Sequence, residues 1–461
     1  MIVLVARERA LISLRNDQTI YSGAEMIDMQ KRVTRSTVLA EELIILMKDN
    51  KSKGRLNIIF VSTLIPEVVL NKLIKEGNYK LALAPQKLNR LICHGLKLNG
   101  ESVYSLYEMP IPTGIKIERQ ADIIENGVIY KQLPYINMTF IKNIMLVLSV
   151  IFYVGNIVKR TGRTKNIIIC DSLNISVSIG AIIAAKIFNL QTIGLVTDLP
   201  NYLYMTNVCS ANKRLKYNLI RKINLFIMDQ FESYILLTNY MGTVVNRKRK
   251  PSVIIEGMVP INLDNYNHRE KIEKDEPPVV LYAGGLNEEY GVYNLVRAVD
   301  RSSEKFELHI FGDGPLRSVI EEFSRRNKRI KYYGVMPNCE VLDMERRATL
   351  LINPRPAGQG FTKYSFPSKN LEYMTSGTPL ITSELEGIPK EYFPYVICLR
   401  DSSEDSIQKT IEDTLKMDNN EMVKLGCAAK EFVLNYKNNV VQTEKILAMI
   451  MLGPLVKTKN G

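Results

Sequence analysis

The sequence has few histidines, no tryptophan and no clustered cysteines. Its 461 residues include three histidines, and its six cysteines are scattered without a CxxC spacing. Zinc sites and disulfide frameworks depend on clusters of these residues, so the sequence predicts neither, and we expect no metal in the functional site. This cysteine pattern suits a reducing compartment, so we expect a cytoplasmic protein.

Long apolar runs are also scarce. The first apolar stretch, residues 1–6, is too short for a secretory signal and is followed at once by charged residues. The most apolar later run, residues 144–154, lies within a segment shorter than the roughly 20 residues needed to span a bilayer. We interpret it as a buried helix, with an interfacial or membrane segment as the alternative.

Acidic residues are outnumbered by basic ones. The formal net charge is +13, from 61 Lys and Arg against 48 Asp and Glu, and basic residues concentrate in residues 213–222 and 247–250. Neither cluster is interleaved with aromatic residues as in a nucleic-acid platform, so no nucleic-acid partner is predicted. Two interpretations stay open, a solvated face and a surface that meets an anionic membrane from the cytoplasmic side.

The pattern of short apolar runs alternating with helical stretches predicts an α/β protein with two doubly wound sheets. The length of the chain allows two domains that each bury a full core. The predicted division is residues 1–55 as an appendage of unknown role, 56–262 as an N-terminal domain, 263–278 as a linker, 279–437 as a C-terminal domain, and 438–461 as a C-terminal helix that crosses back to the first domain. Predicted strands are residues 57–61, 166–170, 192–196, 234–237 and 253–255, then 279–283, 306–311, 330–333, 350–353 and 379–382.

Glycines follow two predicted strands of the C-terminal domain. Gly284 and Gly285 lie between a strand and a helix, where backbone amides and a helix N-terminus can approach a phosphate. A tight turn without a ligand is the alternative. The second loop, FGDGP at residues 311–315, lacks the GxGxxG spacing, so it does not support a dinucleotide site.

Residues 352–382 contain the strongest signal. A helix is predicted from Pro367 to a stop at Gly377, and within it Lys369 and Glu372 share a face. Lys369, with the free amides around Ser368, can hold a diphosphate, and the carboxylate of Glu372 can accept hydrogen bonds from two ribose hydroxyls. The alternative is an exposed ion pair without a ligand.

The motifs of the C-terminal half, taken in order, resemble those of a known family. YAGGLNEEYGV, HIFGDGP, YYGV, INPRP and FPSKNLEYMTSGTPLIT are similar to the C-terminal domain of retaining GT-B glycosyltransferases, the polysaccharide-building glycosyl transferases group 1 of the family 4 type. The resemblance covers residues 278–395 firmly and 56–261 more loosely. It implies two Rossmann-like domains that face a cleft, with a nucleotide-diphosphate sugar held mainly by the second.

The resemblance also implies roles for single residues. Glu372 matches the glutamate that binds ribose, and Val335 matches the position whose backbone meets the base. Gly285 and Tyr290 stand where many relatives carry an Arg and a Lys for the diphosphate, and Tyr364 stands where many carry another glutamate.

Other cations must then bind the phosphates. The nearest candidates are Lys369, Lys363 and Arg355. The donor site is thus expected to comprise nearby residues of the C-terminal domain: Gly284, Gly285, Val335, Arg355, Lys363, Tyr364, Ser368, Lys369 and Glu372.

Two aspartates follow strands of the N-terminal domain. Asp171 matches the place where relatives put a cleft residue near the transferred sugar, and Asp198 ends the next strand, so both are candidate catalytic residues. A helix cap or a turn is the alternative at each position. By position alone, Ser62, Thr63, Gln86 and Lys87 face the acceptor.

The expected activity, implied by the resemblance, is transfer of a sugar with retention, without a metal or cofactor. The expected acceptor is a saccharide or a polyprenyl-linked saccharide, and the expected pathway is surface polysaccharide biosynthesis. A sugar-nucleotide epimerase of the same fold and a non-catalytic subunit that binds glycan or nucleotide sugar are the alternatives.

Overall fold

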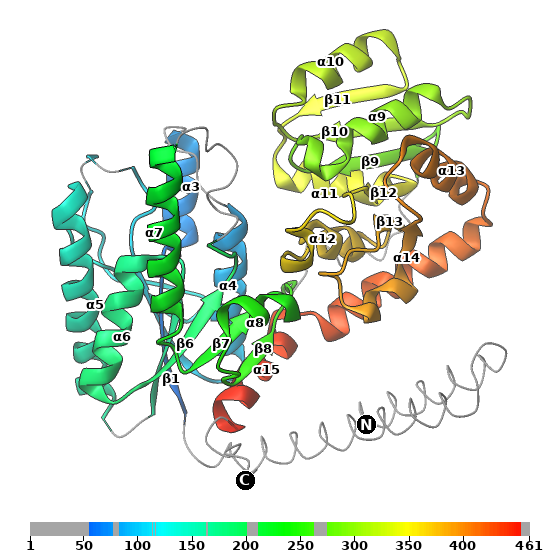
Figure 1. The fold of residues 1–461 in the computed structure, drawn as a ribbon. Helices are drawn as coiled ribbons and strands as arrows, with labels where there is room; N and C mark the ends of the chain where they lie inside the picture. The colour runs from blue at the N-terminus through cyan, green and yellow to red at the C-terminus, as the bar shows by residue number, and fades with distance from the viewer. Residues whose placement is uncertain are drawn as a thin grey trace, which may run out of the picture.

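The computed structural model describes residues 55–76, 83–112, 114–115, 117–162, 165–200, 211–261 and 274–452. Figure 1 shows two domains, each built around its own sheet, with the N-terminal domain to the left and the C-terminal domain to the right. The predicted appendage, apart from residue 55, and most of the linker predicted over 263–278 lie outside the described residues.

An eight-stranded sheet forms the centre of the N-terminal domain. Its strand order is β3-β4-β2-β1-β5-β6-β7-β8, and its strands are parallel except for β3, which pairs antiparallel with β4. The interiors of strands such as NIIFVS and NIIICD are apolar on both faces because helices cover both faces of the sheet. The strands are β1 Asn57–Ser62, β2 Ser102–Tyr107, β3 Ile123–Glu125, β4 Val128–Gln132, β5 Asn166–Asp171, β6 Gln191–Val196, β7 Ser233–Leu236 and β8 Ser252–Ile254.

Helices lie on both faces of this sheet. Because crossovers between parallel strands are right-handed, α5, α6 and α7 share one face, while α3, α4 and the final helix α15 share the other. Helix α15 packs directly against α4. The helices are α3 Glu67–Glu76, α4 Leu83–Leu98, α5 Thr139–Thr161, α6 Ile175–Phe188, α7 Ala211–Met228, α8 Asn239–Val245 and α15 Asn439–Leu452.

The C-terminal domain has a six-stranded parallel sheet in the order β11-β10-β9-β12-β13-β14. This is the Rossmann order, in which the strand sequence reverses between the first and fourth strands, here β9 and β12. Its elements are β9 Val279–Ala283, α9 Val292–Arg301, β10 Glu307–Phe311, α10 Arg317–Arg326, β11 Ile330–Gly334, α11 Asn338–Arg347, β12 Leu350–Asn353, α12 Lys369–Ser376, β13 Leu380–Ser383, β14 Ile397–Leu399, α13 Glu404–Leu415 and α14 Asn419–Tyr436. Short 3₁₀ turns cover Glu288–Tyr290, Thr362–Tyr364 and Lys390–Tyr395.

The predicted fold class is confirmed, since both domains are doubly wound α/β structures. The predicted strands are present within one residue at each end. Two central strands were not predicted, β2 and β4. Their sequences, SVYSLY and VIYKQ, place polar residues among the apolar ones and so lack the continuous apolar run of the other strands.

Helix α5 departs in part from its interpretation as a buried helix. One face packs against α6, but Phe140, Ile144, Leu148 and Phe152 on the other face are exposed. Among the described helices, it is the one whose length and composition, from Phe140 to Thr161, would allow it to cross a membrane. A third of its most apolar window is buried.

The chain passes between the domains at two places that pair with each other. The amide of Val259 donates to the carbonyl of Lys437, and the amide of Asn439 donates to the carbonyl of Val259. Beside this short parallel bridge, Lys437 Nζ lies 2.5 Å from Glu256 Oε1, and both side chains are almost fully buried. Tyr392 of the C-terminal domain donates its hydroxyl to the same oxygen at 2.9 Å.

Replacing Glu256 should therefore weaken the whole molecule. Glu256→Ala removes the buried partner of Lys437 and leaves it the half-exposed Glu391, 2.5 Å away, as an ion-pair partner, so we expect a loss of about 3 kcal/mol in the free energy of unfolding. Lys416→Ala, which breaks an exposed pair with Glu304, is the matched control and is expected to change it by less than about 1 kcal/mol. Urea unfolding of both variants measures the difference, and equal losses would contradict this account of the crossing.

Candidate functional site

The carboxyl ends of β9 and β12 define the centre of the candidate site. In a doubly wound sheet, ligands bind outside the carboxyl ends of the strands, at the point where the strand order reverses. Gly284 and Gly285 follow β9, and Arg355 follows β12. The structure therefore brings together two parts of the predicted donor site that are 70 residues apart in sequence.

The glycines after β9 and β10 allow two loops to pack closely. The amide of Gly284 donates to the carbonyl of Phe311 at 3.0 Å, and the amide of Leu286 donates to the carbonyl of Asp313 at 3.0 Å. Gly312 has a φ of +125°, and a Cβ there would lie 1.9 Å from the carbonyl oxygen of Gly284. The glycines thus serve loop packing, and the Gly284 amide is engaged within the protein.

Arg355 reaches across the reversal point to the loop after β9. Its guanidinium lies 4.5 Å from the centre of the Tyr290 ring, and its Nη1 lies 3.4 Å from Ser365 Oγ. A Cβ on Gly285 would lie 3.1 Å from the same tyrosine ring. The cation of Arg355 therefore lies beside Gly285 and Tyr290, the two positions that carry no cation of their own.

Helix α12 is fixed against the strand ends by two buried side chains. Ala283 donates its amide to the Tyr373 hydroxyl at 2.7 Å, and that hydroxyl donates to the Ala283 carbonyl. Asn370 accepts a hydrogen bond from Asn353 at 2.6 Å and donates to Thr382 at 3.1 Å. The helix ends at Gly377, as predicted, with φ of +81°.

Four ionisable groups meet at the start of α12. Lys369 forms an ion pair with Glu372, and its Nζ lies 3.5 Å from Oε1 of Glu345 on α11. Lys87 of α4, in the other domain, lies 2.9 Å from Glu372 Oε2. We call Lys87, Glu345, Lys369 and Glu372 the α12 charge cluster. It joins the two domains at the predicted ribose-binding residue.

The two carboxyl groups of this cluster have opposite pKa shifts. Burial alone would raise the pKa of Glu372, but Lys369 and Lys87 outweigh it and lower that pKa to about 2. Glu345 is fully buried, and this burial raises its pKa to about 8 in spite of Lys369, with the negative charge of Glu372 adding to the rise. At neutral pH, Glu372 is thus an ionised acceptor while Glu345 is mostly protonated.

The other predicted donor residues lie around this cluster. Ser368 is exposed at the beginning of α12 and makes no side-chain cap. Lys363 and Tyr364 form a short turn that touches the N-terminal domain, where Thr238 donates its hydroxyl to the Lys363 carbonyl at 2.9 Å. Val335 is exposed at the end of β11, next to Gly334 with φ of +70°.

The N-terminal domain places acidic side chains at the carboxyl edge of its sheet. Asp171 ends β5, and its carboxylate accepts a hydrogen bond from the amide of Leu173 at 3.2 Å. Burial at the strand end raises the pKa of Asp171 to about 6, and the charges of Asp198 and Glu108 add to the rise. Asp198, in the loop after β6, is exposed.

The acceptor-side residues differ in what they do. Gln86 accepts from the amide of Ile65 and donates to the carbonyl of Thr63, so it holds the loop after β1 in place. Lys87, one residue later, instead reaches the C-terminal domain. The sequence places Lys87 on the acceptor side but gives no sign of its pairing with Glu372.

Glu345 is the residue of the cluster that sequence reasoning missed. Its helix reads NCEVLDMERR, which is typical of a solvated surface helix. The packing of α12 against α11 buries the carboxyl group, and that contact joins residues about two dozen positions apart. The sequence contained one sign of this burial, because Glu345 shares a helical face with the apolar residues Val341 and Leu342.

A separate hollow of about 430 Å³ lies between α9 and α10, away from these strand ends. It is lined by Tyr293, Arg297, Arg301 and Arg326 among others, and these arginines are engaged with Glu404, Asp405 and Asp300. We therefore locate the candidate site at the strand ends rather than in this hollow.

Comparison with protein families agrees with the geometry of the C-terminal half. Residues 264–432 match the family described as glycosyl transferases group 1. The C-terminal part of this chain is thus a glycosyl transferases group 1 domain. A search of curated proteins found no match.

Solved structures share the fold across both domains. Sucrose-phosphate synthase from Thermosynechococcus elongatus is 16% identical, with a TM-score of 0.56 over 87% of this chain and 98% of its own. A glycosyltransferase from Rickettsia africae is 13% identical, with a TM-score of 0.56 over 88% and 100%. HepE of Anabaena, in complex with UDP and glucose, is 10% identical, with a TM-score of 0.54 over 86% and 99%. The predicted GT-B fold is confirmed.

The pKa of Glu345 leads to a test by pH. A carboxyl group whose folded-state pKa is raised to about 8 stabilises the fold fully below its unfolded pKa, and the stabilisation is lost as the pH rises through about 8. Glu345→Gln removes this loss. Because the loss is spread between the ordinary pKa of 4.5 and about 8, the Tm of the variant relative to that of the parent should rise by roughly 2–4 °C from pH 6 to pH 9.

Thermal unfolding followed by circular dichroism measures this difference. Glu340→Gln, at an exposed position of the same helix, is the control and should leave the Tm difference near zero at both pH values. A Tm difference for Glu345→Gln that stays constant with pH would show that this carboxyl group does not titrate in the range.

Proposed function

We propose that this chain, whose C-terminal part is a glycosyl transferases group 1 domain, transfers a sugar from a nucleotide-diphosphate donor to a saccharide acceptor with retention of configuration. The observation that carries the proposal is the α12 charge cluster, which sets an ionised glutamate and a lysine at a helix N-terminus beside the reversal point of the sheet. Such a position suits a ribose next to a diphosphate.

In this proposal, different residues bind the ribose and the diphosphate of the donor. Glu372 stays ionised at neutral pH, so it only accepts hydrogen bonds, as the two hydroxyls of a ribose require. Lys369 lies one turn before it at the positive end of α12. Arg355 supplies a planar cation on the other side of the reversal point, beside Gly285 and Tyr290.

The charge balance of the cluster suits an anionic ligand. With Glu345 protonated, the two lysines face one carboxylate, and the cluster carries a single net positive charge near neutral pH. If Glu345 were ionised, the cluster would be neutral. The raised pKa of Glu345 thus leaves Glu372 as the ionised partner of Lys369 and gives the cluster its net positive charge.

The reaction itself requires stabilisation of a leaving group. Breaking the bond between the sugar and the diphosphate develops negative charge on a phosphate oxygen, which Arg355, Lys369 and the amides that begin α12 can stabilise. We propose that this occurs without a metal or cofactor, with the nucleotide sugar as co-substrate. Asp171, whose pKa is raised to about 6, is our candidate for the group that faces the transferred sugar, with Asp198 in the loop that follows the neighbouring strand β6.

The acceptor is proposed to bind the carboxyl edge of the N-terminal sheet. A saccharide or a polyprenyl-linked saccharide fits the surface polysaccharide pathways that the motifs resemble. We propose a cytoplasmic location, with the acceptor presented at the inner face of the membrane. The observations for the membrane side are given in the next subsection.

Nucleotide binding separates the roles of the two key residues. UDP is the first probe because HepE, which shares the fold, binds it. Glu372→Gln should raise the Kd of uridine and of UDP alike, by about 10- to 100-fold, because the loss concerns the ribose. Arg355→Gln should raise the Kd of UDP by about tenfold and leave that of uridine unchanged, because the loss concerns the phosphates.

Isothermal titration calorimetry measures these constants, with GDP in parallel to identify the base. Glu340→Gln is again the matched control. Unchanged UDP binding in Glu372→Gln would overturn the ribose assignment, and equal losses of uridine and UDP in Arg355→Gln would overturn the phosphate assignment.

Turnover tests the activity itself. Purified protein, a nucleotide sugar and a membrane extract should together release nucleoside diphosphate and extend a saccharide, whereas omission of the extract should abolish the release. Product formed without an acceptor, as free nucleotide or isomerised sugar, would indicate an epimerase instead. Donor binding without any turnover would indicate a non-catalytic subunit.

A further inference from the structure

The outer face of the N-terminal domain carries apolar side chains that do not pack into a core. Of the large apolar side chains that are exposed in the described part of the chain, eleven lie on α5, α6 and α7, against five in the whole C-terminal domain. Soluble proteins rarely gather such residues on one surface without a binding partner. The three helices form one layer, α5 next to α6 and α6 next to α7.

The exposed residues form stripes along the helices. On α5 they are Ile141 and a series four residues apart, Phe140, Ile144, Leu148 and Phe152, with Phe140 exposed by 85% and Phe152 by 64%. This spacing places one residue on each successive turn of one helix face. Ile183 and Ile187 continue the apolar surface on α6.

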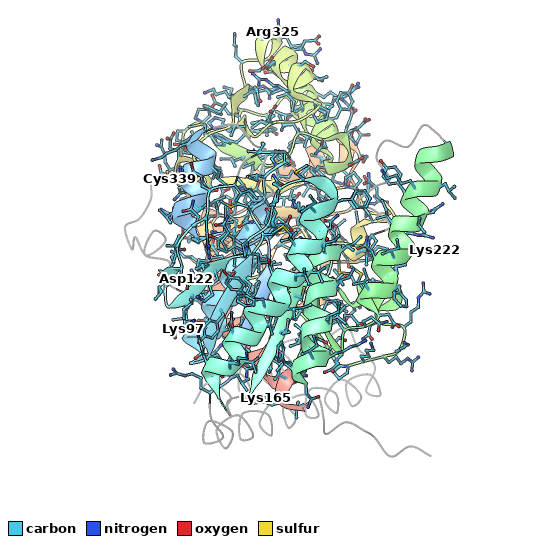
Figure 2. All side chains as sticks on the ribbon, turned by 90° about the vertical axis from the view of Figure 1, so that its left-hand side faces the viewer. Lys97, Asp122, Lys165, Lys222, Arg325 and Cys339 are labelled. Carbon is cyan, nitrogen blue, oxygen red and sulfur yellow. The ribbon has the colours of Figure 1, made fainter. Side chains whose placement is uncertain are left out.

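Helix α7 carries a second stripe with lysines on its two sides. Leu215, Leu219, Ile223 and Phe226 fall within an arc of about 80° at 100° per residue. Lys216 and Lys222 are exposed just beyond the two edges of that arc. Figure 2 faces this layer, with α5 and α6 in the centre and Lys222 labelled on α7 beside them.

The charge of the layer has a single sign. The sequences of α5, α6 and α7 contain nine Lys and Arg residues and no Asp or Glu. Long basic side chains beside an apolar stripe can extend to lipid headgroups while the apolar residues enter the acyl boundary. A second copy of the same face would set basic residues against basic residues, because a two-fold interface pairs a surface with itself.

We propose that this face of α5, α6 and α7 docks on an anionic lipid bilayer. The helices lie in the plane of the membrane surface rather than across it, because their inner faces are part of the domain core. Both α5 and α7 begin at the carboxyl edge of the sheet, and Lys142 in the first turn of α5 pairs with Glu108 there at 2.7 Å. The docked face thus extends to the edge that carries Asp171.

Binding of the full chain to vesicles tests the proposal without reference to catalysis. Vesicles of phosphatidylcholine alone are compared with vesicles that contain about one quarter phosphatidylglycerol. The chain should sediment with the anionic vesicles, and added salt should weaken this binding. Sedimentation with neither vesicle type would overturn the proposal.

Two double variants at exposed positions separate the contributions. Phe152→Ser with Phe226→Ser should weaken binding to the anionic vesicles by about tenfold or more, because it removes two of the largest apolar side chains from the face. Lys216→Glu with Lys222→Glu should abolish the preference for anionic over neutral vesicles. Val423→Ser with Lys424→Glu, exposed on α14 of the other domain, is the matched control and should bind as the parent does.

Light scattering after size-exclusion chromatography tests whether a second copy of the chain, rather than a bilayer, covers this face. A parent dimer that becomes a monomer in the Phe152 and Phe226 variant would show that a second copy covers the face, and would overturn the proposal. Unchanged vesicle binding in that variant would overturn it as well. UDP binding should be equal in all variants, so a failure of the donor site and a failure of the membrane face give different results.

Discussion

The buried ion pair between Glu256 and Lys437 is the interaction on which the arrangement of the two domains depends. It lies where the chain crosses from the first domain to the second and back, and the two crossing segments hydrogen-bond to each other beside it. Gln442 and Tyr392 donate further hydrogen bonds to the same glutamate. A buried charge with this many partners accepts few alternative geometries, so the crossing defines how the domains face one another.

The candidate site requires that definition because it contains groups from both domains. Lys87 of α4 pairs with Glu372, and Thr238, between β7 and α8, donates to the Lys363 carbonyl. The crossing at Glu256 and Lys437 therefore sets the position of helix α12 relative to the carboxyl edge of the N-terminal sheet. The polar contacts between the domains, by contrast, can exchange as ligands enter.

The sequence predicted the strands and the helix that form this site better than it predicted the ion pairs and pKa shifts within it. Buried parallel strands read as apolar runs, so β9 and β12 could be located to the residue, and Gly377 marked the end of α12. The pairing of Arg355 with Tyr290 and the burial of Glu345 depend on which loops and helices meet in space. No local pattern contains that information, since a glutamate in NCEVLDMERR looks the same whether it is solvated or enclosed.

Two features of the chain are unusual: Gly285 and Tyr290 stand where many relatives carry cations for the diphosphate, and the outer face of α5, α6 and α7 is apolar. Both bear on how the two domains share donor and acceptor. In the proposed function the donor is held by Arg355 and the α12 charge cluster, to which the N-terminal domain contributes Lys87. The rest of the N-terminal domain is then free to serve the acceptor and its surroundings. A lipid carrier is confined to a plane, so an enzyme that uses one gains most when the face that meets this plane ends at its acceptor edge. Helices α5 and α7 both begin at that edge, so the proposed docking of their apolar stripes would bring the bilayer toward the edge that carries Asp171.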